Sequence, residues 1–577
     1  MVAKKIYAIL LVLIIVLSFA ACGEDDTTTA ATTATTAATT AADSTTEATD
    51  EGPQMNENGE FDVQLPCSDE VVTITMWGGT PDSSAGMNSQ NDSVARQELE
   101  KRTNVHIEWT HPVTGQETAQ FNLMIASEQY TDAIIGNSGY YIGGFDKFIN
   151  DGILVDLAPY TEYMQNYMKA RSVDLDTLLN TTTDAGYIAF WDRLKINEQG
   201  AFMGPLIRKD ITDEIGIDLS SVVTYDDWYE MLTSLVNAGY SNPATLYISS
   251  GTGNGLDTYM MAGMNMNTRL YAIDGEIRYS ANQPEFKDYI TLMNKWYTEN
   301  LIDKDFYSRK SSDYESLFLN GDLIVGPIMY INYDRYNMQT VDDGKWAAIE
   351  VPLESADMER HIGAGTNPVH AVNTTTSITT SMDESLIPVF CQYQDYLYTE
   401  EGTLLANYGI ENETFHYDED GNPVFEDFIT NSPDGLSLTA QMTRYALIHG
   451  SFSGNYYWER EISPQMSEEA LETAEIWDTH LDYQRTPTLN VAEEHQTEYS
   501  TIFNDINTMV EEYSVKFITG QLSIENDWAA FEQELQNMNV GQMIEWAQQA
   551  YDMYAARDIT VGYTEAQLEE YGINDLK

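Results

Sequence analysis

The strongest constraint on the fold is an alternation of predicted strands and helices in the first apolar-rich part of the chain. Apolar and β-branched residues predict strands over 70–77, 105–109 and 132–136. Helical spacing of apolar residues predicts helices between them, over 93–101 and 116–126. Strands separated by helices form parallel sheets with helices on their faces. We therefore expect an α/β fold.

The length of the chain argues for more than one lobe. At 577 residues it is too long for a single hydrophobic core. A further helix is expected to begin near Tyr225, and a further strand over 323–330. Close to the C-terminus, apolar residues recur at helical spacing over 502–517, and Gly520 ends the run. Two or more lobes are expected, with extra helices at the C-terminal end.

The N-terminus has the layout of a secretory signal peptide. Two lysines precede an apolar run over 6–19 that carries no charge. Small residues stand directly before Cys22, so the segment resembles a bacterial lipobox. We expect residues 1–21 to be a signal peptide and Cys22 to be lipidated, which would hold the mature protein on the outer face of the cell membrane. Ordinary secretion or a retained N-terminal anchor is the alternative.

A biased segment follows the lipobox. Residues 22–60 consist mainly of Thr, Ala, Asp, Glu and Gly, with almost no large apolar side chain. Such a segment cannot bury enough apolar surface to offset the entropy lost on ordering. We expect a disordered linker that tethers a globular body to its lipid anchor.

The charge of the chain excludes some partners. Lys and Arg number 28 against 92 Asp and Glu, which gives a net charge of −64. A surface this acidic repels phosphate backbones and anionic lipid headgroups. We expect no nucleic-acid partner, and contact with the membrane through the lipid anchor only.

Motifs that carry chemistry are weak in this sequence. Residues 418–422 begin like a calcium loop, but their glycine is misplaced, and a hairpin turn is the preferred interpretation. No metal site, cofactor or catalytic residue is assigned, although paired carboxylates stay possible among so many acidic residues. Cys67 and Cys391 are expected to be two separate buried thiols, with a disulfide as the alternative.

Several segments carry a resemblance to a known family. They are VTITMWGG (72–79), the stretch 101–136, GPLIRKDITDEIGID (204–218), TYDDWYEML (224–232), the stretch 393–425 and the tail 515–554. In these segments and their order, the chain resembles the extracellular solute-binding lipoproteins (family 1) that serve carbohydrate ABC importers, in particular the long subgroup found in Firmicutes. The resemblance implies a two-lobe, periplasmic-binding-protein-like fold (type II), whose hinge-linked lobes close on a ligand.

The same resemblance suggests how the chain is divided between the lobes. We expect residues 61–190 and 354–410 to form the first lobe, and residues 191–353 and 411–577 to form the second. The stretch 186–191 would be the first crossing between them.

Candidate ligand contacts follow from position at strand ends, where ligands collect in parallel sheets, or at the predicted crossings. Aromatic rings can cover the apolar faces of a sugar, and planar polar groups can bind its hydroxyls. The stacking candidates are Trp77, Tyr140, Trp191 and Tyr330, and Trp458 is a candidate for a lid on the helical side. The hydrogen-bonding candidates are Asp132, Asn137, Asp192, Arg193 and Arg208.

The resemblance implies a monomer that captures an oligosaccharide or sugar in an interlobe cleft and delivers it to the permease subunits of an ABC importer. One alternative is a peptide or another solute bound by the same fold. The other is a surface glycoside hydrolase or lyase, which would need two carboxylates about 5 to 10 Å apart across a cleft.

Overall fold

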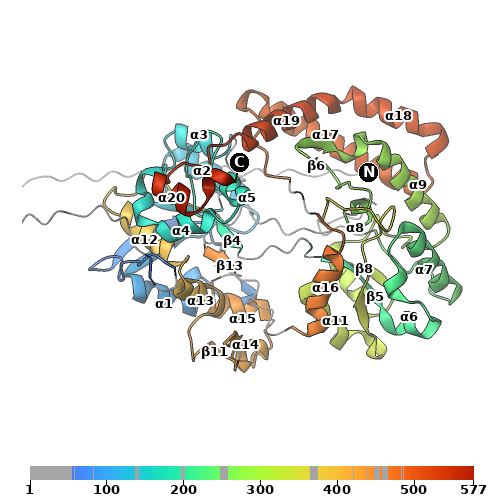
Figure 1. Cartoon of the computed structure of the whole chain (residues 1–577), viewed down its shortest axis with the longest axis horizontal. Helices are drawn as coiled ribbons and strands as arrows, with labels where there is room; N and C mark the ends of the chain where they lie inside the picture. The colour runs from blue at the N-terminus through green and yellow to red at the C-terminus, as the bar shows by residue number, and fades with distance from the viewer. Residues whose placement is uncertain are drawn as a thin grey trace, which may run out of the picture. The chain divides into compact units, whose positions relative to one another are not determined.

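The computed structural model describes residues 55–576, with gaps at 57–58, 82, 137–140, 142, 196–200, 202, 247–255, 257, 364–374, 420, 437, 448–454, 458–465, 483 and 485 (Figure 1). The predicted signal peptide, Cys22 and the linker up to residue 54 lie outside the described residues. Residues 55–577 cluster into one unit by their contacts, and this unit contains two separate larger sheets.

The first sheet confirms the predicted parallel arrangement. β1 (Val72–Trp77) lies between β2 (Val105–Thr110) and β3 (Ala133–Ile135), and it is parallel to both. A fourth strand, β10 (Thr376–Ile378), pairs antiparallel with β3. Because β1, β2 and β3 run in the same direction, their carboxyl ends lie at one edge of the sheet.

The helices predicted around this sheet are also present. α1 (Val94–Thr103) and α2 (Glu117–Ser127) connect the parallel strands, as the α/β pattern requires. α1 ends at Asn104, whose φ of 56° is left-handed and whose N–H donates to the Glu100 carbonyl. Leu99 of α1 is buried in one core with β1 and β2, so the apolar face of the helix covers the sheet.

The second sheet is antiparallel. β5 (Met203–Arg208) lies between β8 (Val325–Met329) and β9 (Trp346–Ala348). The helix predicted near Tyr225 is α7 (Tyr225–Asn237), and it begins with a capping box in which Thr224 and Asp227 each bind the backbone N–H of the other.

Three long helices at the C-terminal end pack on the second lobe, as the apolar spacing predicts. They are α17 (Glu493–Ile518), α18 (Ile524–Asn537) and α19 (Val540–Ala555). α17 lies against α9 (Pro284–Thr298), and the side-chain amide of Asn294 donates to the last carbonyls of α17, on Phe517 at 2.9 Å and Ile518 at 3.1 Å.

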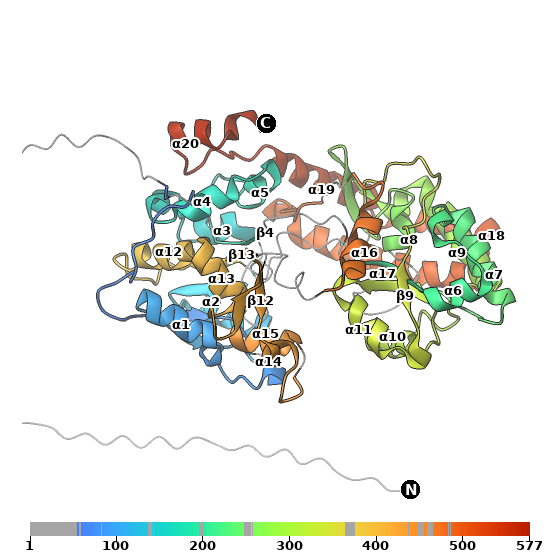
Figure 2. The same cartoon turned by 60° about the horizontal axis from the view of Figure 1, so that its bottom comes forward.

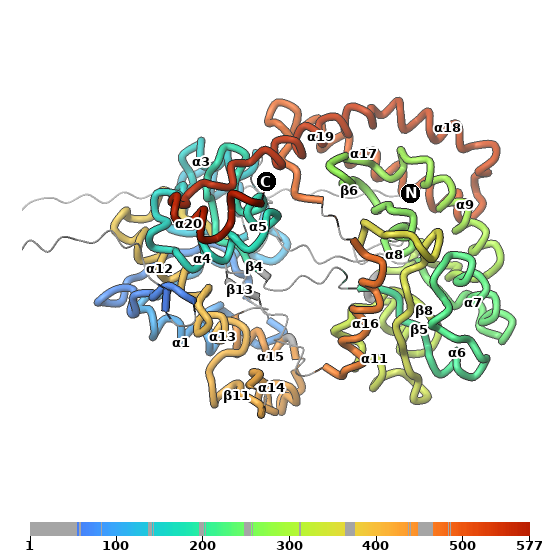
Figure 3. Tube along the Cα trace, in the orientation of Figure 1, coloured from blue at the N-terminus to red at the C-terminus, as the bar shows by residue number. Residues whose placement is uncertain are grey.

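The other helices and strands complete the two lobes and their connections (Figure 3). The helices are α3 (Gly144–Asn150), α4 (Gln165–Arg171), α5 (Leu175–Asn180), α6 (Lys209–Ile215), α8 (Thr258–Ala262), α10 (Ser311–Leu319), α11 (Tyr333–Gln339), α12 (Ile387–Tyr396), α13 (Glu400–Tyr408), α14 (Asp427–Thr430), α15 (Leu438–Tyr445), α16 (Glu468–Asp478) and α20 (Glu565–Glu570). The strands are β4 (Arg193–Lys195), β6 (Leu270–Ile273), β7 (Glu276–Tyr279), β11 (Phe415–Tyr417), β12 (Pro423–Phe425) and β13 (Asn455–Tyr457).

The turn preferred over a calcium loop is confirmed. β11 and β12 form an antiparallel hairpin in which Phe415 pairs with Phe425. The carboxylate of Asp418 accepts a hydrogen bond from the backbone N–H of Asn422 at 2.7 Å, which is a common way to close a turn.

Each larger sheet has its own hydrophobic core. Ile74, Ile135 and Ile378 share one core, which we call the first core, and the lobe around it the first lobe. Ile207 and Val325 share another, the second core, in the second lobe with α7, α9 and α17. The predicted lobe boundaries stay predictions.

One segment assigned from the sequence to the second lobe makes contacts with the first. Leu447 packs in the first core, and the Ser93 hydroxyl before α1 donates to the Ala446 carbonyl at 3.0 Å. α15, which precedes these residues, also lies against α1. Residues 446–447 therefore contact the first lobe, although they fall in the range 411–577 that the prediction assigns to the second lobe.

The two remaining cysteines behave as the preferred interpretation predicts. Cys67 and Cys391 are free and buried, and burial raises the pKa of both thiols. Within the described part of the chain, we find no helix with the length and apolar character needed to cross a membrane.

Candidate functional site

Aromatic side chains gather where β1 and β3 end. Trp77, the last residue of β1, is 4% exposed and packs edge-on against Phe121 of α2, with ring centroids 5.4 Å apart. Tyr141, beyond the end of β3, stacks on Phe148 of α3 at 3.9 Å. Phe145 lies 4.4 Å from Phe190, near the predicted crossing. We call this group the aromatic rim.

Tyr141 and Phe145 are half-buried, whereas Trp77 is buried in the same apolar cluster. Asn137 and Tyr140 were the ligand contacts predicted in the segment after β3, and neither Tyr141 nor Phe145 was among them. Aromatic residues close behind a predicted strand end were the signal that could have identified them.

Polar groups hold the half-buried tyrosine in place. The Tyr141 hydroxyl donates to Asp151, and Lys147 lies 3.0 Å from the same carboxylate. The hydrogen bonds from Tyr141 and Lys147 keep the pKa of Asp151 below its ordinary value, while burial raises the pKa of Tyr141. The tyrosine therefore stays neutral with one ring face packed on Phe148.

Asp132 joins two strands of the first sheet. It precedes β3, and its Oδ2 accepts hydrogen bonds from the backbone N–H of Thr75 at 2.8 Å and from the Thr75 hydroxyl at 2.7 Å. The Asp132 N–H in turn donates to that hydroxyl at 2.9 Å. The structure thus places this candidate at the amino end of β3, with its carboxylate engaged by β1.

The three consecutive candidates at the predicted crossing have different environments. Trp191 is 0% exposed and lies in the first core, 6.0 Å from Phe390. Asp192 is 1% exposed, and its Oδ1 accepts from the Arg193 N–H at 2.8 Å. Arg193 is half-buried and begins β4, which pairs with β13. In this structure, only Arg193 of the three has a side chain near the surface.

The two candidates on the second sheet lie at opposite ends of its strands. In the antiparallel register, Met203 pairs with Met329 and Ile207 with Val325. Arg208, the last residue of β5, therefore lies at one end of the paired strands. Tyr330, which follows β8, lies at the other end.

Arg208 is held by its own neighbours. It is 6% exposed, and its Nε and Nη2 donate to the two carboxylate oxygens of Asp210 at 2.8 and 2.7 Å. Burial would raise the pKa of Asp210, but hydrogen bonds from Arg208 and the Lys345 N–H outweigh it and hold this pKa below its ordinary value. Tyr330 is 6% exposed within an apolar cluster around Trp346. The candidates Asn137, Tyr140 and Trp458 lie outside the described residues.

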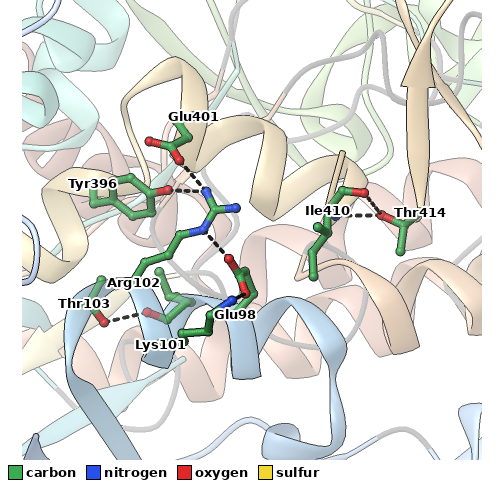
Figure 4. Close-up of polar contacts among 9 residues, drawn as sticks. Glu98, Lys101, Arg102, Thr103, Tyr396, Glu401, Ile410 and Thr414 are labelled. Atoms are coloured by element: carbon green, nitrogen blue, oxygen red, sulfur yellow. Dashed lines mark hydrogen bonds and ion pairs between the residues drawn. The ribbon is translucent and has the colours of Figure 1, made fainter. Parts of the chain in front are cut away.

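A polar cluster that the sequence analysis did not identify joins three helices of the first lobe (Figure 4). Arg102 of α1 donates to Glu98 at 2.9 Å, to the Tyr396 hydroxyl at 2.8 Å and to Glu401 at 2.6 Å. Burial lowers the pKa of Arg102, and these hydrogen bonds outweigh it and raise the pKa overall. The cluster fixes α1 against α12 and α13.

No group of three or more His, Cys, Asp or Glu side chains suited to a metal ion occurs among the residues that the structure describes.

The sequence matches one known protein family and is similar to at least two known proteins. Residues 86–364 match the family of bacterial extracellular solute-binding proteins. FusA of Streptococcus pneumoniae, a fructooligosaccharide ABC transporter substrate-binding protein, is 23% identical over 501 residues, which cover 81% of this chain and 88% of FusA. Lipoprotein LipO of Bacillus subtilis is 22% identical over 336 residues, which cover 55% of this chain and 63% of LipO.

Solved structures with the same fold include two solute-binding proteins. An HMO-binding, ABC-transporter-associated solute-binding protein of Bifidobacterium longum infantis has a TM-score of 0.68 at 15% identity, over 85% of this chain and 100% of that structure. An alginate-binding protein, AlgQ2, has a TM-score of 0.63 at 17% identity, over 84% of this chain and 99% of that one. The likeness establishes a two-lobe solute-binding fold, as the resemblance implied.

Proposed function

Since the chain belongs to the bacterial extracellular solute-binding proteins, we propose that it captures a sugar or oligosaccharide between its lobes and delivers it to an ABC importer. The observation that carries this proposal is the similarity to a fructooligosaccharide substrate-binding protein over 81% of the chain. The protein would release its ligand unchanged, as a binding protein and not an enzyme.

The aromatic rim is the proposed contact with the ligand. A half-buried tyrosine or phenylalanine offers one ring face to the apolar face of a sugar, while its other face is packed on the protein. The half-buried rings that we propose for this role are Tyr141, stacked on Phe148, and Phe145, tilted against Phe190, in the apolar cluster that also contains Trp77. Asn137 and Tyr140, in the same segment, remain proposed contacts, as do Arg193 and Trp458.

We further propose that the protein acts as a monomer held outside the cell membrane by a lipid on Cys22. The segment over 1–22 has the charge and apolar pattern of a cleaved, lipidated leader. LipO, which is similar over 336 residues, carries the name lipoprotein. Mass spectrometry of the membrane fraction would test this anchor, because an unmodified Cys22 would contradict it.

A thermal-shift screen of the full chain tests the proposed ligand class. Fructooligosaccharides, alginate oligomers, other neutral oligosaccharides and short peptides would each be added, followed by chromatography of the mixture. A ligand at 100 times its dissociation constant stabilises the folded state by about 2.7 kcal/mol. A shift with one saccharide class, recovered intact, supports the proposal. A shift with peptides only would contradict the sugar class, and cleaved saccharide would contradict a pure binding role.

Tyr141→Ala tests the rim once a ligand is known. Loss of one stacking contact should weaken binding by about 1 kcal/mol, roughly fivefold in Kd. Tyr417→Ala is a suitable control, because Tyr417 is 41% exposed on the β11–β12 hairpin. Equal affinity of the two variants would remove Tyr141 from the site without changing the proposed ligand class.

A further inference from the structure

The C-terminal helix α19 is attached to the second lobe along most of its length. Val540 and Met543 are buried in the second core. Further along, the side-chain amide of Gln548 accepts from the Ile277 N–H at 2.7 Å and donates to the Gly275 carbonyl at 3.0 Å, so it binds the β6–β7 hairpin through both its polar atoms. Ala547 packs on the same hairpin.

The residues that follow are attached to the first lobe. We call residues 554–576 the C-terminal strap; in Figure 2, α20 lies beyond the end of α19, beside α4 and α5. Arg557 is 6% exposed, and it donates to Asp184 at 2.7 Å and to the Leu179 carbonyl at 2.6 Å. Tyr554 and Ile559 pack with Leu179 in one apolar cluster.

Further along the strap, two more contacts hold it on the first lobe. The Tyr563 hydroxyl donates to the Met168 carbonyl at 2.7 Å, and Met168 lies in the first core. Gly562 has a φ of +83° and lies so close to the first lobe that a Cβ there would be 2.8 Å from Ile188. This close packing shows that the strap is docked on the lobe and does not merely pass over it.

The joint between the two attachments is short and stiff. Gln548 binds the second lobe, and Tyr554 already packs in the first, within the same unbroken helix. Six residues of helix span about 9 Å, with no flexible linker between. A movement that separates the lobes at this point must therefore bend α19 or release one of its ends.

We propose that the C-terminal strap limits how far the two lobes can separate in the unliganded protein. The buried Arg557–Asp184 pair and the close contact at Gly562 hold one end, and Gln548 holds the other. The proposal concerns the free protein, so its failure would leave the proposed function untouched, and a different ligand class would leave the strap untouched.

The distance between two spin labels, one on each lobe, measures this restraint directly. Leu123 of α2 is 68% exposed and Met338 of α11 is 77% exposed, so both positions can carry a label as cysteine variants in a full chain with Cys22→Ala. The native Cys67 and Cys391 are buried and should not react. Without added ligand, the labelled parent should give one narrow distance distribution.

Two variants should release the strap by different routes. The pair Arg557→Gln with Asp184→Asn removes the ion pair without leaving a buried charge alone. Gly562→Ala places a side chain at a φ of +83°, which residues other than glycine rarely adopt, with its Cβ 2.8 Å from the Ile188 Cδ1. Both should broaden the distribution toward longer distances. Arg278→Gln, which removes the partly exposed pair with Glu276 on the second lobe, should match the parent.

Hydrogen exchange makes the result decisive. In the parent, the hydrogen-bonded strap amides of Tyr563, Leu568 and Tyr571 should be protected, and in the two variants this protection should be lost. Lost protection with an unchanged distance distribution would overturn the proposal. Rapid exchange of the strap in the parent would also overturn it, whether or not the variants fold.

Discussion

Asp395 is a carboxylic acid enclosed in the first lobe. It is 3% exposed on α12, and its carboxylate accepts from the Tyr167 N–H at 2.8 Å and the Asn166 amide at 2.9 Å. Burial raises its pKa from 3.8 to about 7, and the two hydrogen bonds oppose the rise without cancelling it. The folded protein therefore binds this proton more tightly than the unfolded chain does.

The consequence is a stability that falls as the pH rises. The contribution of Asp395 is fully present below its ordinary pKa of 3.8 and is lost as the pH passes through about 7. In the parent, the free energy of unfolding should fall by on the order of a few kcal/mol between about pH 5 and about pH 8. We expect Asp395→Asn to flatten the dependence of the melting temperature on pH over this range.

Asp383→Asn provides the control for this measurement. Asp383 is an exposed carboxylate whose pKa is lowered by hydrogen bonds from Ser385, so its removal should change the pH dependence of stability only below its ordinary pKa of 3.8 and leave the slope between about pH 5 and about pH 8 unchanged. A parent whose melting temperature does not fall across the same pH range would contradict the assignment of a raised pKa to Asp395.

Gly344 packs directly on the buried guanidinium of Arg208. A Cβ at this position would lie 2.4 Å from the Arg208 Cζ. Gly344→Ala should push the guanidinium off Asp210 and destabilise the second lobe by about 1 to 3 kcal/mol. Gly541→Ala is the matched control, because no atom lies within 4 Å of its added Cβ and alanine favours the helix. Chemical denaturation would measure the free energy of unfolding of both variants. Equal stability of Gly344→Ala and Gly541→Ala would contradict the close packing of Gly344 on Arg208.

At the scale of single elements, the capping box of α7 makes a specific contribution. The Thr224 side chain accepts from the Asp227 N–H, and the Asp227 carboxylate accepts from the Thr224 N–H at 2.8 Å. Thr224→Ala removes the first of these bonds and should destabilise the second lobe by ~1 kcal/mol. Urea denaturation followed by tryptophan fluorescence, to which the buried Trp228 of α7 contributes, would measure it.

The corresponding box of α20 offers a comparison in the same chain. Thr564 and Gln567 form it on a short helix without buried residues. Thr564→Ala should fray that helix and leave the transition of the second lobe unchanged. An effect of equal size in both variants would show that the loss at Thr224 is not local to α7.

The elements of the first lobe were predictable because local signals and tertiary contacts agree there. The strands at β1, β2 and β3 carry β-branched or apolar runs, and the helix at α1 follows a polar residue suited to its N-terminus. The role of Trp191 was harder to predict, because an aromatic residue at a crossing has the same sequence signal whether it faces a ligand or, as here, is 0% exposed in a core.

At the scale of the whole molecule, contacts between distant segments decided what the sequence could not. Nothing local shows that Arg208 is enclosed, because Gly344 packs on its guanidinium and the Lys345 N–H donates to its partner Asp210 at 3.0 Å, both from a segment more than 130 residues further along the chain. Likewise, the apolar spacing of α19 predicts a helix but not that the residues after it return to the first lobe at Asp184. Only the assembled fold contains that information.

The charge of the whole chain gives the last prediction. With 92 acidic against 28 basic residues, the folded state has more self-repulsion than the expanded chain. Added salt should screen this repulsion, because the Debye length falls below about 5 Å near 0.5 M. We expect the melting temperature to rise from about 20 mM to about 500 mM NaCl, and the rise to be smaller near the pI of about 4.1, where the net charge is small.

Salt also weakens exposed ion pairs such as Lys209–Asp213, but each contributes about 0 to 1 kcal/mol. A melting temperature that falls with salt at neutral pH would mean that these pairs outweigh the repulsion.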